Sequence, residues 1–79
     1  MREFRVFYVH IENLEMHEIR VEHFLKGWRV QVIEGGMALV NDRGLTETQA
    51  LESFNNRERE TLDQGYCQLR EEMLSYTTK

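Results

Sequence analysis

The alternation of hydrophobic and polar positions in the first half of the chain predicts β-strands. Four runs rich in β-branched, aromatic or alternating apolar residues span 2–11, 17–25, 28–33 and 37–40. Lys26-Gly27 and Gly35-Gly36 separate the last three runs, and glycine suits such turns because it adopts positive φ angles without a steric penalty. We therefore expect an antiparallel meander of four strands over residues 2–41.

From Thr46 onward the hydrophobic period lengthens from two residues to about 3.6, which indicates helix. Thr46 and Gln49 fit a capping box and predict a short helix over about 46–54. Asn55 and Glu58 repeat this signature. We expect a second, long helix over about 57–76.

The apolar positions of the second helix form a narrow seam with a 4-3-4-3 spacing: Leu62, Tyr66, Leu69, Met73 and Tyr76. Gly65 lies inside this helix, at a cost of about 1 kcal/mol relative to alanine. The cost is either tolerated, or Gly65 lets another backbone approach closely. Together the patterns predict a single α+β domain, residues 1–79, with two helices packed on one face of a four-stranded sheet (ββββαα).

Strand parity predicts which sheet face the helices cover. The expected apolar face consists of Phe4, Val6, Tyr8, Ile19, Val21, Leu25, Trp28, Val30, Val32, Met37 and Leu39. Strand 2–11 is also apolar on its other face, through Phe7, Val9 and Ile11, with Phe24 on the neighbouring strand. Such a strand is interior to the sheet, pairs with itself across a dimer axis, or is covered by another protein.

Composition restricts the classes of partner. The chain has 79 residues and a net charge of −4, so general attraction to nucleic acid or to an anionic membrane is not expected. No apolar run approaches the roughly 20 residues of a membrane span, and no signal peptide is recognised. A single cysteine fits a cytoplasmic protein without an internal disulfide.

Candidate chemistry is sparse. His17 and His23 would lie about 20 Å apart along one strand, so His10, His17 and His23 cannot share one zinc ion. Cys67 is the only thiol, and no histidine base accompanies it in sequence. We predict no enzyme activity, no catalytic or metal site and no cofactor.

These observations favour a small, acidic, non-enzymatic protein-binding module. By size and composition we expect an inhibitor or regulator encoded by a phage or mobile element, of the anti-defence type, which occupies a surface of a macromolecular partner. Eight of the ten basic residues are arginine, which is enriched at binding hot spots. The predicted contact residues are Phe7, Val9, Ile11, Phe24, Arg20 and Arg29, and the protein would bind a protein partner or form a homodimer through strand 2–11.

An alternative function is an antitoxin-like or transcription-linked dimeric regulator that binds a toxin or a basic nucleic-acid-binding protein through its acidic second helix. The run Gly44-x-Thr46-x-x-x-Ala50-Leu51 resembles the strand-to-helix corner of HicB-type antitoxin domains over about eight residues. It departs from that pattern because Gln49 replaces the usual acidic residue and no proline precedes the corner. High salt would weaken binding by an acidic helix, whereas an apolar strand interface would be nearly indifferent to salt.

Overall fold

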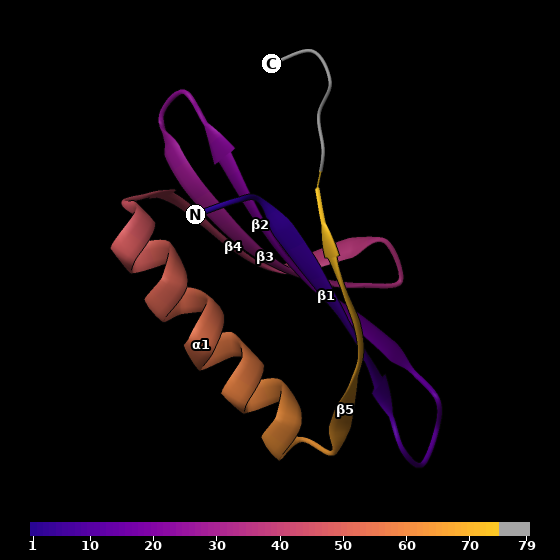
Figure 1. The fold of residues 1–79 in the computed structure, drawn as a ribbon. Helices are drawn as coiled ribbons and strands as arrows, with labels where there is room; N and C mark the ends of the chain where they lie inside the picture. The colour runs from indigo at the N-terminus through magenta and orange to yellow at the C-terminus, as the bar shows by residue number, and fades with distance from the viewer. Residues whose placement is uncertain (75–79) are drawn as a thin grey trace.

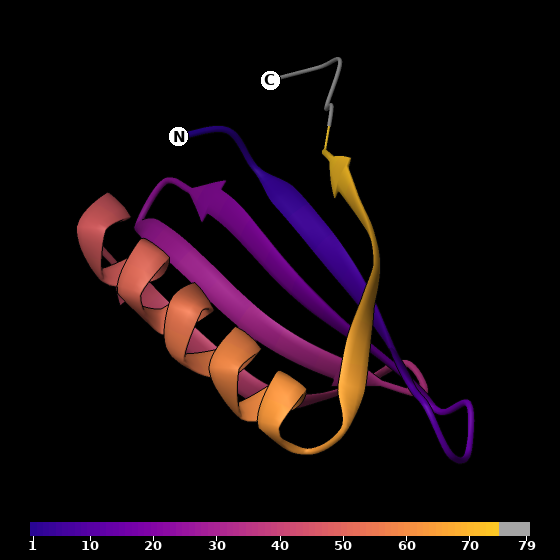
Figure 2. The same cartoon turned by 60° about the horizontal axis from the view of Figure 1, so that its bottom comes forward.

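In a computed structural model, which describes residues 1–74, the chain forms one antiparallel sheet with a helix packed on one of its faces (Figures 1 and 2). The elements are β1 (Phe4–His10), β2 (Met16–Phe24), β3 (Gly27–Glu34), β4 (Met37–Leu45), α1 (Glu47–Asp63) and β5 (Tyr66–Met73). Across the sheet the strand order is β4-β3-β2-β1-β5. No helix among the described residues is long and apolar enough to cross a membrane.

The prediction of two C-terminal helices, over 46–54 and 57–76, is wrong. The capping box at Thr46 is confirmed, since Thr46 Oγ1 accepts from Gln49 N at 3.1 Å and Gln49 Oε1 accepts from Thr46 N at 2.9 Å. Beyond it one helix, α1, continues through the asparagine pair that was expected to interrupt it. Residues 66–73, expected to be helical, form the strand β5 instead, and the expected end of the helix at Tyr76 lies outside the described residues.

Gly65 is the physical reason for this difference. Its φ of 97° lies in the left-handed region, where an L side chain is strained, so the helix ends just before it and the chain turns back along β1. A Cβ atom at this position would lie 3.0 Å from Nε2 of His10. The seam of apolar residues from Leu62 to Met73 therefore crosses from a helix into an edge strand.

The predicted meander of four strands over residues 2–41 is corrected in extent, number and register. The sheet has five strands in residues 1–74, and β4 extends to Leu45. Phe4 lies opposite Val21, four residues from the expected partner Leu25, because the β1–β2 turn is centred two residues earlier in the chain than expected. An even shift keeps every side chain on its predicted face. Gly35 and Gly36 form the β3–β4 turn as predicted, with φ of 57° and 81°.

The hydrophobic core lies between α1 and the sheet. Its buried members are Phe4, Val6, Tyr8, Ile19, Val21, Trp28, Val30, Val32, Ala50, Phe54 and Tyr66. Eight of these were predicted from strand parity, whereas Leu25, Met37 and Leu39 are exposed. Leu25 is exposed because the β2–β3 turn is Leu25-Lys26, one residue earlier than expected. A register shift between Val32 and Ile33 places Val40 instead of Leu39 opposite Val32, and Met37 lies next to the exposed β3–β4 turn.

β1 lies inside the sheet because β5 pairs with its outer edge, from Phe4 opposite Met73 to His10 opposite Tyr66. The pairing joins residues near the two ends of the described chain, and Figure 2 shows β5 alongside β1 after leaving the helix. The pairing satisfies the outer edge of β1, and Phe7 and Val9 on the face opposite α1 stay half-buried. The interpretation of β1 as an interior strand is thereby confirmed.

Candidate functional site

The sheet face opposite α1, which we call the open face, carries a chain of ion pairs across three adjacent strands. On β1, Arg5 donates from Nε and Nη2 to Oε1 of Glu72 on β5, at 3.0 and 2.8 Å. Its Nη1 lies 3.8 Å from Oε2 of Glu18 on β2, and Arg20 donates to the same Glu18 oxygen at 2.8 Å. The hydrogen bond from Arg5 is the main cause that lowers the pKa of Glu72. These pairs hold the arginines in fixed positions on the open face.

Phe7 lies in the middle of this network, half-buried between two guanidinium groups. Arg5 lies 5.0 Å and Arg70 4.9 Å from the centroid of its ring. Arg70 is opposite Phe7 on β5 and is itself paired with Glu72. Each such cation–π contact contributes about 0.5–1 kcal/mol at an exposed site. Phe7 is therefore an aromatic group held in place by the side chains around it.

Next to Phe7 the open face is hollowed. A depression of about 220 Å³ is lined mainly by the apolar side chains of Phe7, Met16 and Ile33, and its lining is completed by His17, Glu18, Gly35 and Gly36. Met16 is an exposed hydrophobic residue opposite Val9, and the glycines bring no side chain to the rim. The depression therefore offers an apolar lining to a side chain of another molecule.

The structure brings together only part of the predicted contact set. Phe7 and Val9 are half-buried on the open face. Arg20 lies opposite Arg5 on the same face. Ile11 is exposed in the loop after β1, at the opposite end of the β1–β2 pair from Phe24.

At the Phe24 end of the open face, Arg29 lies 4.5 Å above the centroid of the Phe24 ring. Arg29 also donates to Oε1 of Glu22 at 2.7 Å, and Glu22 is buried. Phe24 and Arg29 thus form a group separate from the one around Phe7.

Sequence reasoning missed three members of the group around Phe7: Arg5, Arg70 and Met16. Arg5 has the same strand parity as Phe7 and was open to prediction. Arg70 was placed on the second helix, so its approach to Phe7 could not be foreseen. Cys67, also expected on that helix, lies exposed on β5 opposite Val9.

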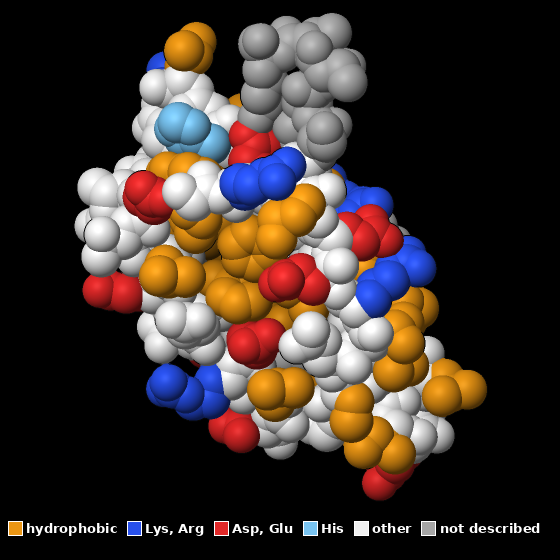
Figure 3. All heavy atoms as spheres, viewed as in Figure 1, with side chains coloured by type: hydrophobic (Ala, Val, Ile, Leu, Met, Phe, Trp, Pro, Cys, Tyr) orange, Lys and Arg blue, Asp and Glu red, His pale blue; other side chains and the backbone are white. Residues whose placement is uncertain are grey.

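The helix side carries a second exposed apolar area, visible in the middle of Figure 3 with acidic side chains upon it. Leu51 and Leu62 on α1 and Met73 on β5 are exposed hydrophobic residues of this side. Glu58 lies on the same flank of α1, and the hydroxyl of Tyr8 donates to its Oε2 at 2.6 Å. Burial, followed by the contact with Glu58, raises the pKa of Tyr8.

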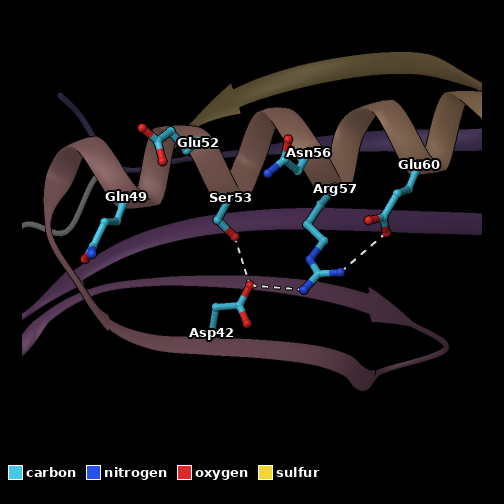
Figure 4. Close-up of a pocket in the computed structure, with 7 residues that line it drawn as sticks. All are labelled: Asp42, Gln49, Glu52, Ser53, Asn56, Arg57 and Glu60. Atoms are coloured by element: carbon cyan, nitrogen blue, oxygen red, sulfur yellow. Dashed lines mark hydrogen bonds and ion pairs between the residues drawn. The ribbon is translucent and has the colours of Figure 1, made fainter.

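On the opposite flank of α1 lies a polar depression of about 330 Å³ (Figure 4). Ser53 Oγ donates to Oδ2 of Asp42 at 2.9 Å, and Arg57 bridges Asp42 and Glu60 at 3.4 Å each. These side chains satisfy one another and join α1 to β4. We read the depression as a structural contact between the helix and the sheet.

Each of the three histidines packs against an aromatic ring. Tyr66 stacks on His17, with ring centroids 4.2 Å apart, and meets His10 edge-on at 4.9 Å. The Tyr66 hydroxyl and Oε2 of Glu34 each lie 3.2 Å from Nε2 of the buried His17. His23 stacks on Trp28 away from this cluster. Residues 1–74 contain no group of three His, Cys, Asp or Glu side chains able to hold a metal ion.

Comparison of the chain with protein-family models, with curated proteins and with solved structures finds no match.

Proposed function

We propose that this protein is a non-enzymatic binding module that recognises another protein through the open face of its sheet. The observation that supports the proposal is the group around Phe7, in which an aromatic ring lies between two paired arginines beside an apolar depression. Aromatic residues and arginine are enriched at the centres of protein interfaces, where well-packed pockets receive an anchor side chain. Residues fixed before binding lose less conformational entropy on association.

The partner that fits this surface is a different protein with a protruding apolar side chain. The depression beside Phe7 is concave, and two identical depressions brought face to face cannot fill one another. The ion pairs of Arg5 and Arg20 already neutralise most of the local charge, so the contact should depend little on salt. Such a module acts as an inhibitor or regulator by occupying the partner surface.

The alternative function, a regulator that binds through an acidic second helix, depended on carboxylates that would share that helix. Glu58, Glu60 and Asp63 lie on α1, whereas Glu71 and Glu72 lie on β5. Glu72 is bound to Arg5 on the open face, and Glu58 accepts from Tyr8. The carboxylates therefore do not form one continuous helical face.

The test replaces Val9 and Ile33 by lysine on the open face, singly and together. A matched control, Leu25→Lys, introduces the same charge at a fully exposed leucine in the β2–β3 turn. Partners captured by the wild type from host lysate are quantified by mass spectrometry at low and high salt, and light scattering gives the mass of the purified protein. Folding of each variant is checked by Trp28 fluorescence.

We expect the folded open-face variants to lose a partner that Leu25→Lys retains, at both salt concentrations. Retention of every partner by the folded Val9→Lys, Ile33→Lys variant would refute the assignment of the open face. A wild-type dimer that Val9→Lys converts to a monomer would replace the proposed partner with a second copy of this chain.

A further inference from the structure

A pocket lies between the β2–β3 turn and the end of β4, which are at the same end of the molecule in Figure 1. Its volume is about 200 Å³, and its lining consists of Phe24, Lys26, Gly27, Trp28, Arg29, Arg43 and Gly44. Three of these side chains are basic and none is acidic. The chain as a whole has a net charge of −4, so this pocket is a positively charged site on a negatively charged protein.

Two of the three basic side chains have no carboxylate nearby, within the described part of the chain, to compensate their charge. Among the ion pairs of residues 1–74, neither Lys26 nor Arg43 has a carboxylate partner, whereas Arg29 is paired with Glu22. Arg43 is oriented by a neutral group: when the side-chain amide of Asn41 is flipped, the orientation that satisfies both residues, its oxygen accepts from Nη2 at 2.9 Å and from Nε at 3.0 Å. The pocket thus has an excess of about two positive charges, estimated by counting formal charges at neutral pH.

Arg29 adds a hydrogen-bond donor. Its Nη2 binds Glu22, but its Nε is buried and has no hydrogen-bond partner. A buried donor without an acceptor is costly, and an acceptor bound in the pocket that Arg29 lines would supply the missing partner. The exposed ring of Phe24, which lies 4.5 Å from the Arg29 guanidinium, supplies an apolar surface beside these donors.

We infer that this pocket binds a phosphate monoester group. At neutral pH such a group carries about −1.5 to −2 charges, which matches the uncompensated cations, and its oxygens accept the forked hydrogen bonds of arginine. A carboxylate would neutralise only one of the two cations. The ester could belong to a small metabolite or to a phosphorylated side chain, and the exposed Phe24 ring favours an ester carried on a ring. This site is independent of the contact proposed at Phe7.

The test is a titration of the 15N-labelled protein with phenyl phosphate, followed by amide NMR shifts. The Gly27 and Gly44 signals report on the pocket, and those of Gly35 and Gly36 report on the far end of β3. Arg43→Gln and Lys26→Gln remove the uncompensated charges. Arg59→Gln is the matched control, since Arg59 is an exposed helical cation that has no ion pair in residues 1–74 and does not line the pocket.

We expect saturable shifts at Gly27 and Gly44, and a loss of affinity of at least fivefold in each pocket variant and less than twofold in Arg59→Gln. Absence of saturation would overturn the site, as would an equal loss in Arg59→Gln, which would indicate attraction to net charge alone. A phosphotyrosine tripeptide is titrated in parallel. Tenfold tighter binding of the tripeptide would assign the group to a phosphorylated protein, and equal binding would assign it to a small ester.

Discussion

Replacing Gly65 by alanine tests the turn from helix to strand, because the two descriptions of this residue predict opposite signs. If Gly65 were inside a long helix, alanine would stabilise the protein by about 1 kcal/mol. In the structure Gly65 has a φ of 97°, and an added Cβ would lie 3.0 Å from Nε2 of His10. We therefore expect Gly65→Ala to destabilise the protein.

The magnitude has two contributions. Holding a side chain in this backbone conformation costs about 1–3 kcal/mol. The contact displaces the His10 ring, whose Nε2 lies 3.0 Å from the carbonyl oxygen of Gln64, and loss of that hydrogen bond costs about 0.5–1.5 kcal/mol. Adding the lower and upper limits gives roughly 1.5–4.5 kcal/mol. A chain of 79 residues has a stability on the order of 4–12 kcal/mol, so the loss would be large.

Urea unfolding followed by the fluorescence of Trp28, the single tryptophan, measures the change. Gly36→Ala is the matched control, because its φ is 81° and no atom lies within 4 Å of the added Cβ. It should lose only the backbone contribution, about 1–3 kcal/mol. In a His10→Ala background, the cost of Gly65→Ala should fall toward that of the control. A stability equal to or above that of the wild type would refute the strand description.

Two further predictions concern α1 and its contact with β1. Thr46→Ala should cost about 1 kcal/mol through loss of the capping box, whereas Thr48→Ala, an exposed threonine of the first helical turn, should cost less than half as much in the same urea assay. Tyr8→Phe should cost about 1–3 kcal/mol at pH 7 through loss of the hydrogen bond to Glu58. Because the folded protein raises the pKa of Tyr8, its contribution is fully present below the unfolded pKa of about 10 and is lost as the pH rises toward the folded value. Stability curves of the wild type and Tyr8→Phe should therefore converge above about pH 10, and parallel curves would contradict the assignment.

Strand parity was enough to predict the helix-covered face of β1, β2 and β3. The partner of Phe4 was predicted four residues too far along the chain, as Leu25 instead of Val21. Because the side-chain period in a strand is two residues, this even error left each side chain on its predicted face. The open-face positions of Phe7, Val9, Arg20 and Arg29 followed from the same rule.

The fifth strand could not be predicted in this way. Residues 66–73 do not alternate cleanly, and their apolar spacing also fits a helix, so local pattern favoured the wrong element. Their conformation depends on the left-handed backbone at Gly65 and on hydrogen bonds to β1, more than fifty residues earlier in the chain. Arg70 and the arrangement around Phe7 were missed for the same reason.

The pairing of β1 with β5 also has a consequence for synthesis on the ribosome. A hairpin forms in about 1–10 μs, so β1 and β2 can pair almost as soon as both have emerged. Translation at about 5–20 residues per second separates His10 from Tyr66 by roughly 3–11 s. During those seconds the outer edge of β1 has unpaired N–H and C=O groups beside Phe7 and Val9. Until β5 is made, the nascent chain therefore offers an open strand edge that can pair with a neighbouring nascent chain or a chaperone.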